Sequence, residues 1–401
     1  MSDSGRLEGL LAMLMTRSHS SSVRGAALLS TFVLLVGLGG CTPDTPPTPG
    51  PPSSALSSLN TDLEQFGRHQ LNSGASAVLM HVKVGNEAWS GAFGVRDGDT
   101  KEPADSGDSF HVASITKSMV AASVIRLVEQ GRIRLDGLVS EYLPEFEAIM
   151  NPPEPISVRR LLNQTSGIPN FEVPLARSGP LRQVLEAPMT GEQRLALAGT
   201  QAWVQNASQR FEYSSSNYVT LGLIVERVTG RSLGDVLRSD FFEPLGMSGS
   251  LLSRSGPAPA TMVHGYVIID DEMVDVADAG FHAGSASGGV ISTVEDVNRF
   301  YSALLQGELV SPTMVKEMQG PSTAQYGYGL YPWNDSCTNG FYYGHGGGTP
   351  GYRSIAMSSA DGTRQLAVFV AQSAERLTSG DPSESTELID FAQRALDSTC
   401  Q

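Results

Sequence analysis

A serine and a lysine three residues apart, Ser114 and Lys117, carry the strongest chemical signal in this sequence. They follow an extended segment and begin an amphipathic helix that we expect from about Ser114 to Gln130, with Gly131 as its stop. Residues three apart lie on one face of a helix, so the two side chains should meet. A serine whose proton passes to a neighbouring amine is an activated nucleophile, and a helix N-terminus favours the oxyanion formed beside it. The pattern therefore predicts acyl transfer through Ser114.

Two later motifs carry groups that suit the same chemistry. Tyr213 begins a Tyr-Ser-Ser run in mid-chain, and His345 precedes three glycines that end at Gly348. Glycine lets a backbone approach a ligand closely, because it has no Cβ. A single tyrosine or histidine is more often structural, so each motif gains weight only from the others. The seven histidines show no metal-ligand spacing, and we expect neither a metal nor a cofactor.

The hydrophobic patterns around these motifs predict an α/β (α+β) fold with two lobes. An amphipathic helix should open the domain, and the pattern of residues 131–281 is mostly helical. Strands and a last helix are predicted, in order, at Ala77–Lys83, Ala88–Val95, Tyr342–Gly346, Tyr352–Ser358, Gln365–Ala371 and Ser385–Leu396. We therefore expect an antiparallel sheet flanked by helices, built from about 55–130 and 282–398, with an all-α lobe inserted at about 131–281. A cleft between the lobes is a natural place for the site.

Composition excludes one class of partner and supports the serine motif. The formal net charge of −15 argues against nucleic acid, because phosphate binding requires a basic surface. At 401 residues and 40% hydrophobic content, the chain is large enough for two compact lobes. Lysine occurs at only four positions, so the place of Lys117 in the motif is unlikely to be coincidence.

The first 41 residues have the features of a bacterial export signal. Arg17 and Arg24 precede an apolar run, Ala26–Leu38, that is too short to span a bilayer as a mature helix. The Leu-Gly-Gly-Cys sequence that ends at Cys41 resembles a lipobox, in which the cysteine is lipidated and becomes the new N-terminus. An ordinary secretory signal with an incidental cysteine is the alternative.

A tether should separate this signal from the folded domain. Residues 42–54 are rich in Pro, Ser and Thr, which predicts an extended and semi-rigid segment. The domain, residues 55–398, would then be lipid-anchored at the extracytoplasmic face of the cell membrane. Two other cysteines remain in the chain, Cys337 and Cys400, and in an exported protein they are a candidate disulfide, with two free thiols as the alternative.

Several segments, taken in order with the serine motif, resemble the serine β-lactamase and penicillin-binding protein superfamily. The resemblance is strongest to the branch of class C β-lactamases and D-Ala-D-Ala carboxypeptidases. The further segments are Leu143–Phe146, Leu161–Pro169, Phe211–Tyr218, Ala286–Thr293, Tyr326–Leu330 and the glycine-rich segment at His345. The resemblance covers roughly Leu56 to Leu396 and implies a β-lactamase/transpeptidase-like fold.

The resemblance also implies a role for each catalytic candidate. Ser114 would be the nucleophile, Lys117 a base with a lowered pKa, and Tyr213 the group that passes the proton to the leaving group. His345 stands where many relatives have lysine. It would line the cleft, help bind a substrate carboxylate or orient Tyr213, and make activity respond to pH between roughly 5.5 and 7.5.

The same resemblance implies how the substrate is held. The backbone N–H groups of Ser114 and Gly348, with Gly347 beside the latter, would form the oxyanion hole. Ser215, the third residue of the tyrosine motif, replaces an asparagine found in many relatives. A hydroxyl has shorter reach and fewer donors than an amide, so we expect weaker binding of a peptide or β-lactam. Asn217 lies two residues further on, which is a different position.

We therefore expect an exported, lipid-anchored serine hydrolase that acts through an acyl-enzyme, as a D-Ala-D-Ala carboxypeptidase or a β-lactamase. A small-ester esterase, and a slow or non-catalytic penicillin- or peptidoglycan-binding lipoprotein, are the alternatives. The partners would be a small-molecule or peptide substrate, such as a cell-wall peptide, and the membrane; we expect a monomer. The Gly230–Gly234 segment matches the G-x-S-x-G pattern of α/β-hydrolases, but it follows a predicted helix, so Ser232 is better interpreted as an N-cap.

Overall fold

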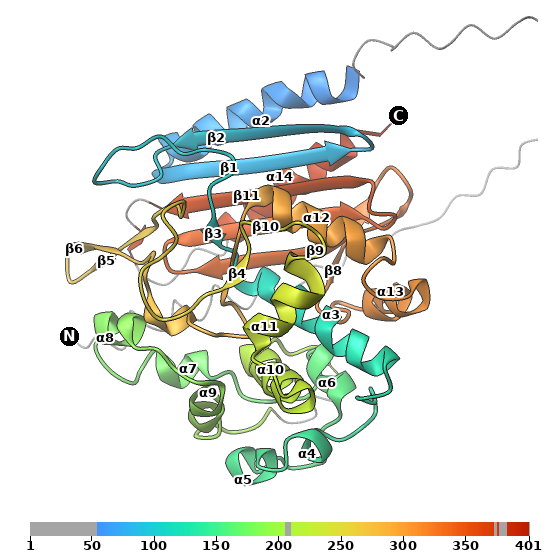
Figure 1. The fold of residues 1–401 in the computed structure, drawn as a ribbon. Helices are drawn as coiled ribbons and strands as arrows, with labels where there is room; N and C mark the ends of the chain where they lie inside the picture. Colours follow the sequence, from blue (N-terminus) through green and yellow to red (C-terminus); the bar gives the residue numbers. More distant parts are fainter. Residues whose placement is uncertain (1–53, 205–209, 373–374, 377–382, 401) are drawn as a thin grey trace, which may run out of the picture.

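A six-stranded antiparallel sheet forms the centre of the molecule in the computed structural model, which describes residues 54–204, 210–372, 375–376 and 383–400 (Figure 1). The strands, in their spatial order, are β2 Glu87–Gly94, β1 Ala75–Val84, β11 Arg364–Gln372, β10 Tyr352–Ser359, β9 Gly340–Thr349 and β8 Tyr331–Asp335. All five strands expected from the sequence lie in this sheet, and β8 adds one edge. Because β1 pairs with β11, the two ends of the chain build one layer.

Both faces of the sheet are buried, and its central strands alternate between two hydrophobic cores. In β11, Leu366, Val368 and Val370 belong to one core, whereas Ala367 and Phe369 belong to the other. This follows from the two-residue period of a strand, which sends successive side chains to opposite faces. A strand buried on both faces needs apolar residues at nearly every position, which is the pattern of β11 in the sequence.

Two helices from opposite ends of the chain cover one face of the sheet (Figure 1). They are α2, Ser54–Asn72, and α14, Ser383–Asp397. The ring of Phe66 in α2 stacks on Phe391 in α14 with 3.7 Å between the ring centroids. The sequence predicted both helices, because their apolar residues recur at helical spacing.

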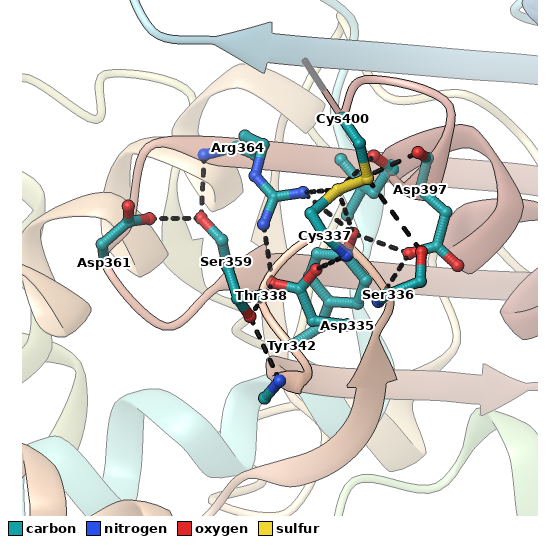
Figure 2. A network of polar contacts seen from close by, with 12 residues as sticks. Asp335, Ser336, Cys337, Thr338, Tyr342, Ser359, Asp361, Arg364, Asp397 and Cys400 are labelled. Carbon is teal, nitrogen blue, oxygen red and sulfur yellow. Dashed lines mark hydrogen bonds and ion pairs between the residues drawn. A yellow bond between two sulfur atoms is a disulfide. The ribbon is translucent and has the colours of Figure 1, made fainter. Parts of the chain in front are cut away.

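A disulfide ties the end of α14 to the turn between β8 and β9. Cys337 and Cys400 are bonded, with 5.2 Å between their Cα atoms. Figure 2 shows that Arg364 of β11 lies beside this bond, where its guanidinium donates to Asp335 at 2.6 Å and to Tyr342 Oη at 3.0 Å. The chain end is therefore held by a covalent bond and by a buried polar network.

The other face of the sheet is covered by α12, Val294–Leu305. The next helix along the chain, α13, Pro312–Gln319, packs against α12. Thr293 caps α12, because its Oγ1 accepts a hydrogen bond from the backbone of Asp296 at 3.1 Å. Two small sheets lie near this face. Their strands are β3 Phe110–His111, β7 Val290–Ser292 and β4 Leu251–Leu252 in one, and β12 Glu375–Arg376, β5 Tyr266–Ile269 and β6 Glu272–Asp275 in the other.

The second region is helical and lies beside the sheet (Figure 1). Its helices are α3 Thr116–Glu129, α4 Val139–Tyr142, α5 Phe146–Met150, α6 Val158–Leu162, α7 Glu172–Leu175, α8 Leu181–Glu186, α9 Gly191–Ala198, α10 Ser215–Thr229 and α11 Leu233–Leu237, followed by a π-helical turn at Arg238–Phe242. We expected helical structure to about Phe281, and this was wrong, because β4, β5 and β6 lie between Leu251 and Asp275. Strands of two to four residues are too short for a two-residue period to be recognised.

The N-terminal segments fall outside this description. Residues 1–53, which include the apolar run, Cys41 and most of the expected tether, lie outside the described residues. Within the part of the chain that is described, none of the helices has the length and apolar character needed to cross a bilayer.

Candidate active site

Ser114 lies in a tight turn between β3 and α3, a largely buried helix. A 3-10 turn, Ala113–Ile115, leads into α3, so the serine precedes the first α-helical residue by two positions. Ala113 has a φ angle of +49°, a conformation that residues with a Cβ rarely adopt. Backbone strain of this kind persists where the surroundings hold it in place, and it gathers at functional sites. Here it directs the chain so that Ser114 faces the groups of the neighbouring elements.

Lys117 is fully buried and faces three oxygen atoms. Its Nζ lies 3.0 Å from Ser114 Oγ, 3.4 Å from Ser215 Oγ and 2.7 Å from the carbonyl oxygen of Ser287. Burial lowers the pKa of Lys117 to about 7, and the carboxylate of Glu172 opposes this shift. A lysine with a pKa near 7 is uncharged in a large fraction of molecules at neutral pH, so it can accept a proton.

The hydrogen-bond partners fix the direction in which the proton of Ser114 can move. A carbonyl oxygen only accepts, so Lys117 donates to Ser287 and keeps its lone pair for another partner. Tyr213 Oη and Lys117 Nζ both lie 3.0 Å from Ser114 Oγ, and a lysine in its neutral form can accept the Ser114 hydroxyl hydrogen while Tyr213 donates. Burial raises the pKa of Tyr213 well above its ordinary value, so Tyr213 is a neutral donor at pH 7. Ser114, Lys117 and Tyr213 therefore form one hydrogen-bonded group with the chemistry expected of a nucleophile, a base and an acid.

The N-terminus of α10 places the tyrosine motif opposite the serine. Ser214 is the N-cap, and its Oγ accepts from the backbone of Ser216 at 3.3 Å. This leaves Tyr213 immediately outside the helix and Ser215 in its first turn, with the Ser215 hydroxyl near Lys117. Ser215 is 1% exposed, so its hydroxyl reaches the lysine and does not extend toward solvent.

Asn217 does not take the place of the asparagine that many relatives have at the third position of the motif. Its side chain is buried and binds the loop after α6, where it accepts from Ser166 Oγ at 2.6 Å and donates to Gln164 Oε1. Gln164 Oε1 also accepts from the backbone of Ser214 at 2.9 Å. These contacts hold the start of α10 against the loop, so Asn217 and Gln164 position the tyrosine motif.

The glycine-rich end of β9 packs directly against the turn that carries Ser114. A Cβ added to Gly347 would lie 2.2 Å from Ser354 Oγ and 2.4 Å from the carbonyl oxygen of Val112, so only glycine fits there. Gly348 has no such constraint, since its nearest neighbour would be Arg353 Cδ at 3.8 Å. The sequence expectation of an oxyanion hole between Ser114 and Gly348 requires this close approach of the two backbones.

His345 lies next to the site but is buried and uncharged, which corrects the expected pH response. Its exposure is 1%, and both ring nitrogens have partners: Nε2 binds Tyr326 Oη at 3.0 Å, and Nδ1 binds the carbonyl oxygen of Gly346. Burial, with the neighbouring Lys117, lowers the pKa of His345 to about 3. His345 therefore stays neutral above pH 5, and Lys117 is the group that titrates near pH 7. A neutral ring with both nitrogens engaged is also poorly suited to bind a substrate carboxylate.

Sequence reasoning assigned no role to three residues that the structure places around the site. They are Ser287, whose carbonyl oxygen holds Lys117, Tyr326, which binds His345, and Glu172, whose charge acts on Lys117. Ser287 and Tyr326 both fall in segments that carried the family resemblance, so that signal was available. Glu172 belongs to no recognised motif.

The serine of the G-x-S-x-G match is structural. Ser232 is the exposed N-cap of α11, and its Oγ accepts from the backbone of Asp235 at 3.2 Å. It follows helix α10, so the strand that a G-x-S-x-G nucleophile requires is missing at this point. Ser232 therefore stabilises the start of a helix, as the sequence predicted.

One group of potential metal ligands occurs in the described part of the chain, at the disulfide network of Figure 2. Ligand atoms of Asp335, Cys337 and Asp397 lie within 4.8 Å of one another. Cys337 is in the disulfide, Asp335 accepts from Arg364, and Asp397 accepts from Tyr342 Oη at 2.9 Å. The coordinating atoms already have protein partners, so the residues fit a structural network better than a metal site.

Comparison with known proteins identifies the family. The family model described as Beta-lactamase matches residues 63–392, which include every catalytic candidate. The chain belongs to this family and is a serine hydrolase with the corresponding fold. Penicillin-binding protein 4* of Bacillus subtilis is 24% identical over 371 residues, which cover 84% of this chain and 80% of that protein.

Solved structures with the same fold include two amidases. A D-stereospecific amidohydrolase from Streptomyces sp. is 27% identical, with a TM-score of 0.70 over 83% of this chain and 98% of that one. The D-amino acid amidase of Ochrobactrum anthropi SV3, complexed with D-phenylalanine, is 24% identical, with a TM-score of 0.72 over 84% and 98%. The second likeness concerns the fold alone.

Proposed function

We propose that this protein is a serine amidohydrolase that cleaves amide or peptide bonds of D-amino acid residues through an acyl-enzyme on Ser114. One observation carries the proposal: Ser114 Oγ lies 3.0 Å from both Lys117 Nζ and Tyr213 Oη, and the pKa of the lysine is about 7. The similarity to the Streptomyces D-stereospecific amidohydrolase supports the substrate class. The D-Ala-D-Ala carboxypeptidase activity expected from the sequence belongs to the same reaction type.

The first half of the reaction forms an ester and releases an amine. Ser114 Oγ attacks the amide carbon while its proton passes to Lys117, and the oxyanion is held by the backbone at Ser114 and Gly348. The C–N bond then breaks. Tyr213 gives its proton to the leaving nitrogen and regains one from Lys117, so the net proton of Ser114 leaves with the amine.

The second half returns the enzyme to its starting state. Water attacks the ester, and Lys117 takes one of its protons. The C–O bond to Ser114 breaks, and the Ser114 oxygen recovers that proton. The products are a carboxylic acid and free enzyme, so amide plus water gives acid plus amine.

Two side chains favour amides over β-lactams among the substrates of this family. His345 is neutral, so it supplies no positive charge for the carboxylate that a penicillin carries. Ser215 has a short hydroxyl that is already near Lys117, where a longer amide would reach a substrate. Both features weaken the binding of an anionic acyl-amide substrate.

The test compares substrates and nucleophile variants side by side. Purified domain should hydrolyse D-alanine amide faster than the L-enantiomer and faster than a chromogenic cephalosporin, and Ser114→Ala should abolish turnover. A fluorophosphonate should label the wild type at Ser114. Efficient cephalosporin turnover with no hydrolysis of the D-amide would refute the amidohydrolase assignment while leaving the acyl-enzyme intact.

Export and lipid anchoring are a separate proposal, motivated by the Leu-Gly-Gly-Cys sequence before a Pro-rich segment. Wild-type protein should fractionate with membranes, and Cys41→Ala should prevent processing as a lipoprotein. Full-length protein found entirely in the soluble fraction and cleaved at another bond would contradict this. We propose that the anchored domain is a monomer, which size-exclusion chromatography of the domain with light scattering tests.

A further inference from the structure

Tyr326 lies in the loop between α13 and β8, and this loop packs closely on the helix that carries Lys117. Ser118, the next residue of that helix, donates from its Oγ to the carbonyl oxygen of Gly329 at 2.6 Å. A Cβ added to Gly329 would lie 2.7 Å from the Cβ of Ala121, and the φ angle of Gly329 is +74°, so glycine is favoured there. The close approach of the loop leaves only 4% of Tyr326 exposed.

The hydroxyl of Tyr326 has two neighbours, and one of them needs its hydrogen. Tyr326 Oη lies 3.0 Å from His345 Nε2 and 3.4 Å from Tyr218 Oη, and Tyr218 already donates to the carbonyl oxygen of Leu162 at 2.9 Å. His345 Nδ1 binds the carbonyl oxygen of Gly346, which can only accept, so in the neutral ring Nδ1 carries the proton and Nε2 is an acceptor. A buried acceptor without a donor is costly, so Tyr326 donates to His345.

The ring of Tyr213 packs against both members of this pair. Its centroid lies 6.3 Å from that of Tyr326, with the two planes at 90°, and 6.4 Å from that of His345. The centroids of Tyr326 and His345 are 5.6 Å apart, so the three rings are in mutual contact. A rotation of the imidazole would change the surface on which Tyr213 rests. Tyr213 Oη lies 3.0 Å from Ser114 Oγ, and proton transfer in the reaction requires that this placement be kept.

The ring of Tyr326 is held by contacts that do not involve its hydroxyl. Phe211 stacks on it with 5.7 Å between the ring centroids, and Tyr331 packs edge-on at 4.6 Å. Tyr326→Phe therefore keeps the aromatic packing and removes the donor to His345. The effect of the hydrogen bond can be measured apart from the effect of the ring.

We propose that Tyr326 is a positioning residue, whose hydroxyl fixes the tautomer and orientation of His345 and thereby holds Tyr213 where it can protonate the leaving group. Tyr326 is buried, so it acts through the imidazole and not on the substrate directly. The inference rests on the proposed function for the role of Tyr213 as the acid. A leaving group that departs as a stable anion needs no proton, so its release does not depend on Tyr326.

The test compares two esters that give the same acyl-enzyme, the methyl and the p-nitrophenyl esters of N-acetyl-D-alanine. The methyl ester loses an alkoxide that must be protonated as the C–O bond breaks, whereas p-nitrophenolate leaves as an anion. Tyr326→Phe should lower kcat/KM by about tenfold for the methyl ester and by less than about twofold for the p-nitrophenyl ester.

Tyr342→Phe is the matched control for a lost buried hydroxyl. Tyr342 is fully buried, packs in the core on the opposite face of the sheet, and donates to Asp397 at 2.9 Å. This variant should keep the wild-type kcat/KM for both esters. An equal loss for the two esters in Tyr326→Phe would make Tyr326 a residue of general structural importance and would overturn the inference.

Nitrogen-15 NMR of the histidine rings gives a second readout that needs no turnover. In the wild type, Nδ1 of His345 should carry the proton and Nε2 should have the shift of a hydrogen-bonded acceptor. Tyr326→Phe should move the Nε2 signal, which is assigned by its loss in His345→Gln. A wild type with the proton on Nε2, or an Nε2 signal that does not move in Tyr326→Phe, would also overturn the inference.

Tyr213→Phe separates this inference from the proposed function. It should show the same selective loss for the methyl ester, and the double variant should lose less than the product of the two single losses, because both residues act on one proton transfer. If Tyr213→Phe is selective and Tyr326→Phe is not, only the role of Tyr326 fails. If Tyr213→Phe slows both esters equally, the acid of the proposed mechanism fails, and the inference fails with it.

Discussion

Replacing Lys117 by methionine should abolish turnover and at the same time stabilise the folded protein at pH 7. The reason is the cost of holding an amine in a fully buried position. The pKa of Lys117 falls from 10.5 to about 7 on burial. One pKa unit corresponds to about 1.36 kcal/mol, so the shift costs about 4 to 5 kcal/mol of folding free energy at pH 7.

Part of this gain is lost again, because methionine leaves hydrogen-bond partners unsatisfied. The carbonyl oxygen of Ser287 would lose its donor, which costs about 1–3 kcal/mol for a buried acceptor. The hydroxyl groups of Ser114 and Ser215 would also lose their contacts with Lys117, but each can form a hydrogen bond with another partner. A net stabilisation of about 1–4 kcal/mol remains, which corresponds to a rise of a few degrees in Tm.

The pH dependence of the stability difference tests a second time whether Lys117→Met stabilises the folded protein. Between pH 7 and 10.5 the unfolded chain binds the lysine proton and the folded protein does not, so wild-type stability rises with pH in this window relative to the variant. The advantage of Lys117→Met should therefore shrink steadily from pH 7 to pH 10. Urea unfolding at pH 7, 8, 9 and 10 measures this, with Lys316→Met on the exposed face of α13 as the control. A variant that is less stable at pH 7, with a difference that does not change with pH, would mean that the buried lysine stays charged.

Three further outcomes follow from the geometry. The acid limb of kcat/KM should have an apparent pKa of about 7, because the active-site lysine must be neutral to accept a proton. His345→Gln should lower kcat but leave the midpoint of that limb in place. A limb that is lost or displaced in His345→Gln would mean that the histidine is the group that titrates. A fluorophosphonate should label the wild type and Ser232→Ala but not Ser114→Ala, and Ser232→Ala should cost about 1 kcal/mol in urea unfolding for a lost helix cap. Replacing Cys337 and Cys400 by serine should lower stability by about 2–4 kcal/mol, since the bond closes a separation of 63 residues, with little change in kcat; a large loss of activity would show that the network of Figure 2 supports the active site.

The sequence by itself determined the features that depend on residues close together in the chain. Ser114 and Lys117 meet because three residues nearly complete a helical turn, and Ser232 caps a helix because its hydroxyl reaches a backbone group three residues on. Five strands of the central sheet were predicted because each has enough residues to show its burial pattern, whereas the edge strand β8 was not predicted. The two-residue β4 and the four-residue β5 were missed because short segments do not.

Only the tertiary structure decided the electrostatic character of the site. The pKa of Lys117 is set by burial and, in the opposite direction, by Glu172, which lies 55 residues further along the chain. From its residue type alone, His345 was expected to titrate near neutral pH. In the fold it is buried in the sheet and bound to Tyr326, so it stays neutral. A residue type fixes which protons are available, whereas burial and neighbours from distant segments fix the pH at which they move.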